Sequence, residues 1–438
     1  MNSSQKSNPL GSAPLNKLIV KFAIPSIIAM LVTSLYNIVD QIFIGNYVGE
    51  LGNAATNIAY PLSTLCAAIS LLLGIGGAAA FNLHMGAGQT KRAGMYVGNS
   101  VLFAALSGVL IFVIAELFLE PMLLFFGSSA SILPYAKEYT RITAVGFPFF
   151  ILSIAGGHLI RADGKPMVSM ICNLTGAVIN TVLDALFVVG FGWGMTGAAA
   201  ATVIGQAAAA MIVLYHIGHY RTVKLTPADF VPKAEIIGTN ANLGMSQGFN
   251  QVAMMVVQIV SNNSLKYYGA QSAYGVEIPI AIVGIVTKLT ALYFSFCIGL
   301  SHAMQPIASF NYGAKNYRRT QEAFRKTRNA GTVVSILAFL LFQLFPRPII
   351  SIFGAGSELY YEFAVKYMRI YLFCVFLNNI QPLTSTFLSA IGKPKKGLFL
   401  SLTRQIIFLL PLILILPLFF GIDGMMYAGA IADFMAAA

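Results

Sequence analysis

Charged residues are scarce in this sequence, since Asp, Glu, Lys and Arg make up 10% of its 438 residues. Soluble domains carry about 25% charged residues, so the composition excludes an ordinary soluble domain. Cysteine is also rare, and all four cysteines (Cys66, Cys172, Cys297 and Cys374) lie within apolar runs. No pair of them has the spacing of a zinc or redox motif. They are therefore predicted to be small core residues.

Motifs for catalysis and cofactor binding are missing as well. The two GKP turns, at 164–166 and 392–394, lack the Ser or Thr of a phosphate-binding loop. The five histidines form no metal-ligand spacing. Gly192, Gly194 and Gly197 spell GxGxxG, but they precede an apolar run instead of following a strand. We expect neither an enzyme nor a cofactor.

Long apolar runs dominate what is present. Hydrophobic residues make up 57% of the chain, and the mean hydropathy is +0.76. Runs of about 20 residues span the roughly 30 Å of membrane hydrocarbon, and backbone groups in lipid must be satisfied within a helix. The sequence therefore predicts an all-α integral membrane protein of twelve spans. They cover about 17–45, 54–81, 93–116, 134–160, 167–190, 196–216, 236–265, 273–303, 326–345, 360–389, 397–420 and 424–438.

The net charge of +12 raises the question of nucleic acid binding. Its distribution argues for a membrane topology instead. With the N-terminus in the cytoplasm, most Lys and Arg residues, Arg404 among them, fall in segments on the cytoplasmic side. This is the positive-inside pattern of helical membrane proteins. We expect a multi-pass protein of the inner (cytoplasmic) membrane, with both termini in the cytoplasm and no nucleic acid partner.

The second half of the chain repeats the first at an offset of 227 or 228 residues. GAGQTKRA (86–93) matches GAKNYRRT (313–320), YTRI (139–142) matches YMRI (367–370), and RADGKP (161–166) matches SAIGKP (389–394). We predict an N-terminal six-helix lobe (1–218), a cytoplasmic linker (219–235) and a C-terminal six-helix lobe (236–438). Because six is even, both lobes enter the membrane from the same side. Their pseudo-two-fold axis then lies along the membrane normal, as in transporters with a site between the halves.

The repeat also predicts that the last span is cut short. Residues 194–216 should recur as about 421–443, but the sequence stops at 438. We expect that the natural chain continues beyond this point, or that its tail has been trimmed or replaced by alanine.

Aspartate within an apolar run is the strongest functional signal. A carboxylate in hydrocarbon costs several kcal/mol unless it is protonated, paired or ion-bound. In the first span, Thr33, Tyr36, Asn37 and Asp40 share one helix face. Pro25 lies upstream of them and removes a backbone hydrogen bond, which permits a helix bend.

The fifth and sixth spans supply matching polar groups. Asn180 and Asp184 lie one turn apart, and Thr202 adds a hydroxyl. Carboxylate, amide and hydroxyl oxygens suit a hard cation such as Na⁺, and a desolvated carboxyl pair can instead hold a proton. The alternative for such polar groups is a structural hydrogen bond between helices. That alternative is weakest for Asp40 and Asp184, because a bare carboxylate is a costly helix contact.

The second half carries mostly neutral polar groups in its spans. Gln251 and Asn378 are amides suited to the wall of a wet cavity. Glu277 is either a cavity residue or an interfacial carboxylate near the outer end of its span, and the interfacial alternative is favoured slightly. Lys288 lies clearly within the same span.

Together these features resemble the multidrug and toxic compound extrusion (MATE) family. The resemblance rests on the two six-helix repeats, the paired GKP turns, Pro25 with Asp40, and the set Asn180, Asp184 and Thr202. It implies an exporter of cationic amphipathic drugs driven by Na⁺ or H⁺, with coupling at Asp40, Asn180, Asp184 and Thr202, as in the DNA-damage-inducible-F-type branch. We predict that the substrate cavity includes Tyr36, Asn37, Gln251, Glu277 and Asn378. Another branch has acidic residues where this chain has Met254 and Asn378, which favours coupling in the first lobe.

Our leading hypothesis is a monomeric cation-coupled drug antiporter in the lipid bilayer, working by rocking of the two lobes. The alternative within the same fold is a flippase for lipid-linked oligosaccharides or lipids. A pyrophosphate cargo calls for a cavity rich in Lys and Arg, whereas Lys288 alone lies clearly within a span. A major-facilitator protein shares the 6+6 design, but GAGQTKRA is not its loop motif. A membrane enzyme or scaffold lacks any supporting motif or soluble domain.

Overall fold

The computed structural model describes residues 8–275, 277–353 and 357–437, and every regular element in these ranges is a helix. The first half contains α2 (Pro9–Ser12), α3 (Leu15–Tyr47), α4 (Glu50–Gly86), α5 (Thr90–Leu117), α6 (Leu119–Phe125), α7 (Leu133–Ala162), α8 (Pro166–Asp184), η1 (Ala185–Gly190) and α9 (Gly194–Gly218). The short helix η2 (Pro227–Phe230) lies between the halves. The second half contains α10 (Ala234–Ala270), α11 (Glu277–Gly313), α12 (Tyr317–Leu344), α13 (Pro346–Ser351), α14 (Glu358–Tyr371), η3 (Val375–Leu377), α15 (Ile380–Ala390), α16 (Pro394–Leu402), η4 (Thr403–Leu409), α17 (Leu410–Phe420) and α18 (Ile422–Ala437).

Several helices extend beyond the apolar runs that predicted them. The run at 326–345 lies in α12, which begins nine residues earlier, at Tyr317. The added segment, YRRTQEAFR, is polar but rich in good helix formers. Water can solvate its charges while the helix continues, so hydrophobicity marks the membrane-embedded part and not the helix end.

Ten helical segments of the described residues are long and apolar enough to span a membrane, when adjacent elements such as α8 and η1 are counted together. Helix α10 has the length, at 37 residues, but its amides lower its hydropathy. Helix α18 has 16 residues, fewer than a full span needs. The predicted all-helical membrane fold is confirmed.

Some helices are interrupted within the predicted spans. The fifth and eleventh spans each contain a π-helical segment, η1 and η4, a type of distortion that is frequent at functional sites. The tenth span breaks between α14 and α15, beside Asn378. In contrast, α3 continues through Pro25 as one helix. The proline therefore removes one backbone hydrogen bond without ending the element.

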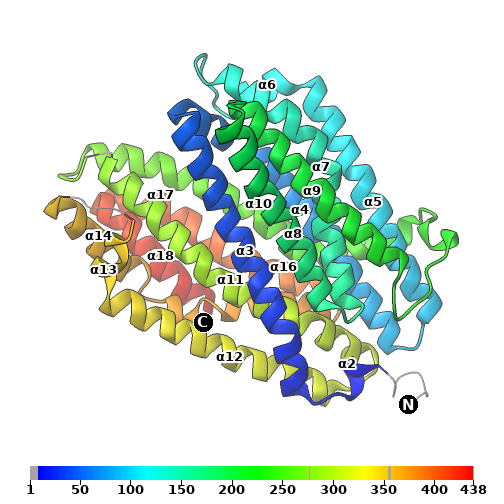
Figure 1. Cartoon of the computed structure of the whole chain (residues 1–438). Helices are drawn as coiled ribbons and strands as arrows, with labels where there is room; N and C mark the ends of the chain where they lie inside the picture. Colours follow the sequence, from blue (N-terminus) through cyan, green and yellow to red (C-terminus); the bar gives the residue numbers. More distant parts are fainter. Residues whose placement is uncertain (1–7, 276, 354–356, 438) are drawn as a thin grey trace.

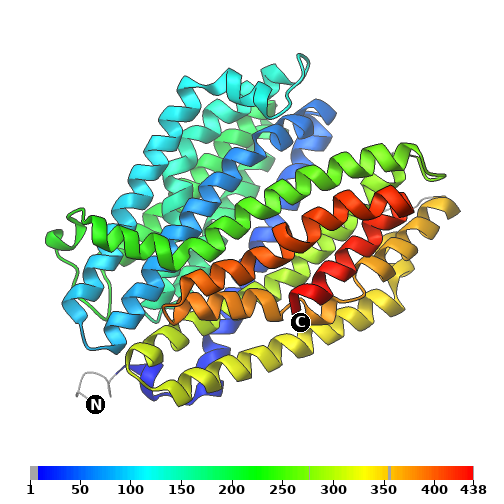
Figure 2. The same cartoon turned by 180° about the vertical axis from the view of Figure 1, so that it is seen from behind.

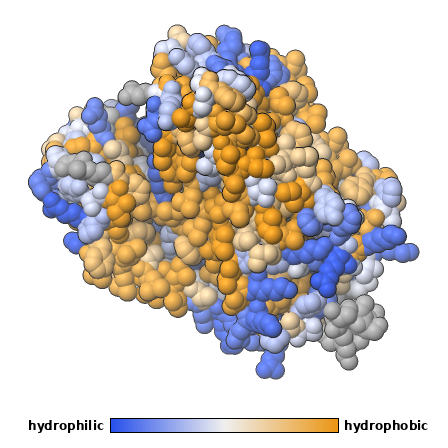
Figure 3. Space-filling model, viewed as in Figure 1, coloured by the Kyte–Doolittle hydropathy of each residue, from blue (hydrophilic) through white to orange (hydrophobic). Residues whose placement is uncertain are grey.

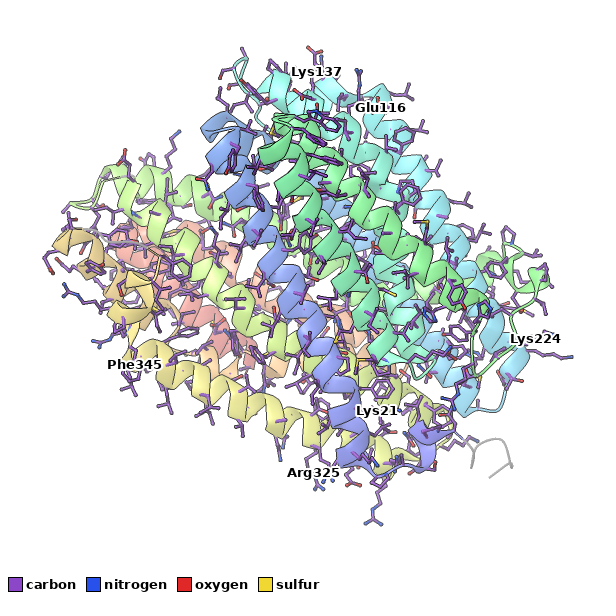
Figure 4. All side chains as sticks on the ribbon, in the orientation of Figure 1. Lys21, Glu116, Lys137, Lys224, Arg325 and Phe345 are labelled. Atoms are coloured by element: carbon purple, nitrogen blue, oxygen red, sulfur yellow. The ribbon has the colours of Figure 1, made fainter. Side chains whose placement is uncertain are left out.

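The helices form two bundles, called here the first lobe (α3–α9) and the second lobe (α10–α18). Figure 1 and Figure 2 show that the lobes diverge from a common end. Lys21, Lys224 and Arg325 lie at that end, called here the basic end, whereas Glu116 and Lys137 lie at the far end of the first lobe (Figure 4). Across the interface α10 packs on α4 and α11 packs on α3. Each lobe thus presents its first helix to the second helix of the other.

Glycines allow the lobes to approach closely. A Cβ added to Gly244 of α10 would lie 1.9 Å from the Leu72 carbonyl oxygen of α4, and one on Gly76 would lie 1.8 Å from that of Asn240. Real side chains do not come so near a backbone atom. These two positions therefore need glycine because one helix backbone rests on the other.

Replacing Gly244 with Ala should therefore destabilise the interface by about 1–3 kcal/mol, because the added methyl group forces α4 and α10 apart. The midpoint of thermal unfolding in detergent should fall. Gly238→Ala is the matched control, since Gly238 lies on the same helix with nothing within 4 Å of its added Cβ. An equal fall in both variants would contradict this account and point to a general effect on α10.

The outer surface is that of a protein embedded in lipid. Figure 3 shows a broad hydrophobic area across the middle of the molecule, with hydrophilic residues gathered at its ends. Large apolar side chains on this surface are well exposed, among them Leu117 (72%) and Phe419 (76%). Such a surface excludes an aqueous setting for these helices. All four cysteines are buried, as predicted.

Candidate functional site: a buried carboxyl pair in the first lobe

Asp40 and Asp184 come together where α3 packs against α8. Their carboxyl groups interact directly. Asp184 is the last residue of α8, directly before the π-helical segment η1, and is fully buried. The Oδ1 atom of each aspartate is buried without a hydrogen-bond partner. The sequence predicted both residues from their spans, and the structure brings them to one place.

Asn180 links the pair to a third helix. With its amide turned to satisfy both of its ends, Asn180 Nδ2 donates to Asp184 Oδ2 at 3.3 Å. Its Oδ1 then accepts from the Thr202 hydroxyl and backbone N–H, each at 3.3 Å. The i, i+4 spacing of Asn180 and Asp184 in α8 makes this contact possible. The predicted set of Asp40, Asn180, Asp184 and Thr202 therefore forms one cluster.

Two tyrosines border the cluster. Tyr36 lies one turn before Asp40 on α3, and Tyr139 reaches it from α7. Both interact with the two carboxyl groups, and Tyr139 also contacts the Thr202 side chain. In the sequence Tyr139 stands out only as part of the repeated YTRI segment. Its place in the site depends on the packing of α7, which no spacing within one helix reveals.

The cluster contains more acceptors than donors. Each aspartate has an unpartnered buried oxygen, and two facing carboxylates cannot both stay ionised without compensation. Either a proton on one of them or a small hard cation between them would supply the missing positive charge. Asp40, Asp184, Asn180 and Thr202 offer only oxygen atoms to such a cation, which suits Na⁺ and not a soft transition metal.

A cleft lies between the lobes at the C-terminal part of α3. It has a volume of about 390 Å³ and separates the C-terminal part of α3 and the start of α4 from α11. Lys288 supplies its positive charge. Its lining residues are Ile38, Gln41, Ile42, Gly45, Asn46, Asn53 and Lys288. The cleft is therefore polar and accessible at the end of α3 that carries Asp40.

The remaining predicted cavity residues occupy separate positions. Asn37 is exposed and donates to the Thr33 carbonyl oxygen at 2.9 Å. Gln251 is half-buried on α10. Glu277 is exposed as the first residue of α11, a position that favours the interfacial alternative. Asn378 is buried and belongs to a second polar network.

That second network corrects two expectations from the sequence. Arg404 is predicted to lie in a cytoplasmic segment, but its side chain is 11% exposed within η4, and its Nε donates to Asp433 Oδ1 at 2.6 Å. Asn378 Nδ2 donates to Asp433 Oδ2 at 2.8 Å. The second half thus contains a buried carboxylate paired with an arginine, where its spans were expected to carry mostly neutral polar groups. Asp433 was missed although it gave the same signal as Asp40, an aspartate inside an apolar run.

Comparison with known proteins agrees with this architecture. The model of the MatE family matches residues 25–186 and 248–415. The chain is 22% identical over 426 residues to the multidrug export protein MepA of Staphylococcus aureus (strain MRSA252), covering 97% of this chain and 92% of MepA. MepA of Staphylococcus haemolyticus is 23% identical, and the match covers 95% of this chain and 90% of that protein.

Solved structures give the same result. The MATE multidrug transporter DinF-BH is 33% identical, with a TM-score of 0.90 over 100% of this chain and 96% of that one. An outward-facing MATE transporter of the MOP superfamily has the same TM-score and coverage at 21% identity, and so supports the fold. From its repeats, its helices and these matches, the chain belongs to the MatE family of multidrug efflux transporters.

Proposed function

We propose that this protein exports cationic amphipathic compounds in exchange for H⁺ or Na⁺ bound at the Asp40–Asp184 pair. The observation that carries the proposal is the pair of buried, unpartnered carboxylate oxygens in the first lobe. The negative charge of this site can bind the coupling ion. The same negative charge can favour a cationic drug nearby. The multidrug transporter DinF-BH adds weight, because it is 33% identical to this chain.

Exchange requires that the ion and the drug prefer different arrangements of the two lobes. Asp40 is on α3, which packs against α11 of the second lobe, whereas Asp184 is on α8 within the first lobe. A cation shared by both carboxyl groups would therefore fix α3 against α8. Fixing or releasing α3 would change its contact with α11, and the lobes would rock accordingly.

The orientation in the membrane follows from the charges. The basic end carries Lys21, Lys224 and Arg325 (Figure 4), and positive segments stay in the cytoplasm. The lobes diverge at the opposite end (Figure 1), so the cleft beside Lys288 faces outward. This protein would thus lie in the inner membrane with its N-terminus in the cytoplasm, in an arrangement open to the outside, and would act as a monomer.

Efflux of a fluorescent lipophilic cation from proteoliposomes tests the proposal. A Na⁺ gradient at uniform pH and a pH gradient without Na⁺ are imposed separately. We expect movement under one gradient and not the other, which names the coupling ion. Protein-free liposomes give the background for each gradient. Efflux equal to that background under both gradients would overturn the proposal.

The flippase alternative has one observation in its favour, the Lys288 ammonium in the cleft. A lipid-linked phosphate or pyrophosphate would need such a cation. A single lysine beside amides is weak compensation for that charge, and the buried aspartates repel anions. Protein-dependent scrambling of an anionic fluorescent lipid, with no efflux of the cation, would favour the flippase.

A further inference from the structure

A second cluster of ionisable groups lies at the interface of the lobes, away from the carboxyl pair. It consists of His158 and Arg161 on α7 and His302 on α11. Their exposed fractions are 3%, 4% and 6%. Because α7 and α11 belong to different lobes, the cluster joins them near the basic end.

The three side chains are in contact. The rings of His158 and His302 meet edge to face, with centroids 4.7 Å apart and planes at 84°. Arg161 Nη2 lies 2.8 Å from His158 Nδ1. Because a guanidinium only donates, this His158 nitrogen is the acceptor. Arg161 Nη1 and His302 Nδ1 are both buried and have no partner in the described structure.

Arg161 is a buried charge that lacks a counter-ion among the described residues. An arginine guanidinium stays protonated in proteins, and an unpaired buried charge costs several kcal/mol. None of the ion pairs in the described part of the chain includes Arg161. A negative group is therefore needed beside it.

The carboxylate closest in sequence is already occupied. Asp163 accepts from the backbone N–H of Arg221 at 2.8 Å and of Thr222 at 2.9 Å. Lys165 Nζ lies 3.1 Å from Asp163 Oδ2. Asp163 thus holds the segment after α9 and neutralises Lys165, which leaves Arg161 uncompensated.

We propose that Arg161 and His302 bind a small monovalent inorganic anion, of the size of chloride, through Arg161 Nη1 and His302 Nδ1–H. The anion supplies the missing charge and satisfies both unpartnered donors. Burial limits its size, because side chains exposed by 3–6% leave no opening for a phosphodiester or a drug carboxylate. Since its two ligands come from different lobes, the anion stabilises the arrangement in which α7 and α11 meet.

The thermal stability of the purified protein tests this site. Unfolding midpoints in detergent are compared in sodium gluconate, chloride and bromide at constant Na⁺, ionic strength and pH. A specific anion raises the midpoint saturably, by about 2–5 °C, whereas gluconate does not. Since Na⁺ is constant, the result is independent of any ion at Asp40 and Asp184, and no transport is measured. Crystals grown in bromide should show an anomalous peak between Arg161 and His302.

Variants locate the effect. His302→Phe keeps the aromatic contact and removes the donor, so the halide-dependent rise should shrink or vanish. Arg161→Met should abolish it, and His302→Phe still decides the question if that variant does not fold. His84→Phe is the control, because His84 lies on α4 against Tyr96. Equal midpoints in gluconate and halide for the wild type, or an undiminished halide effect in His302→Phe, would overturn the proposal.

Discussion

Replacing Asp184 with Asn should reduce gradient-driven efflux from proteoliposomes to the background rate while leaving the protein folded. The change keeps the shape of the side chain and removes the negative charge. Asp184 is fully buried and contacts both Asp40 and Asn180, so the change removes one of the two carboxylates that meet in the cluster. Asp40 would then be the remaining carboxylate of the pair, and neither a proton nor Na⁺ would be shared between α3 and α8.

The expected loss is one of coupling and not of drug binding alone. A ligand shifts a conformational equilibrium only through its different affinities for the two states. Without an ion shared by two carboxyl groups, the gradient no longer favours one arrangement of the lobes. Binding of the fluorescent cation to the detergent-solubilised variant, measured separately, should persist to a greater extent than transport.

Asp423→Asn is the matched control for this experiment. It makes the same chemical change in an aspartate of the second lobe, where Asp423 pairs with Lys366 at 2.7 Å with 31% of its side chain exposed. Efflux by this control should stay close to wild type. Wild-type efflux by the Asp184→Asn protein would rule out the carboxyl pair as the coupling site.

Much of the fold could be predicted from the sequence because lipid strongly restricts which backbone structures can cross it. Residues 134–160, for example, form an apolar run that must be helical in a membrane, and α7 covers it. The ends of the helices could be predicted less well. The polar start of α12 at Tyr317 is stabilised by helix propensity in water. A hydrophobic run therefore does not predict where this helix begins. The π-helical segments likewise depend on packing between helices and not on local composition.

Some residues of the candidate site could likewise be predicted from the sequence, and others could not. Asp40 and Asp184 could be found because each is costly in lipid, and Asn180 because it lies one turn from Asp184. Tyr139 could not be found, since its position depends on how α7 crosses the cluster. The partner of Arg404 required knowledge of which helix faces η4. Spacing within a helix identifies a face, but only tertiary packing identifies what that face meets.

Asp433→Asn should destabilise the protein by about 3–5 kcal/mol, the usual cost of removing one partner of a buried ion pair. Arg404 would remain charged, because guanidinium does not lose its proton in proteins. Arg404→Met should cost less, since Asp433 can take up a proton and Asn378 still donates to it at 2.8 Å. Chemical denaturation in detergent measures the free energy of unfolding of both variants. Glu358→Gln is the control, because Glu358 forms an exposed ion pair with Arg347 and its loss should have a small effect.

The double variant Arg404→Met/Asp433→Leu separates a structural role from a functional one. Replacing a buried ion pair by apolar residues of similar size is often neutral for stability, so most of the loss in Asp433→Asn should be recovered. A double variant as unstable as Asp433→Asn would show that the network depends on more than its charges. In the wild type Arg404 permanently neutralises Asp433, whereas one carboxylate oxygen of Asp40 and one of Asp184 remain without a hydrogen-bond partner. A carboxylate with its own guanidinium has no need of a coupling ion, and this difference favours the first lobe as the place of the proposed ion exchange.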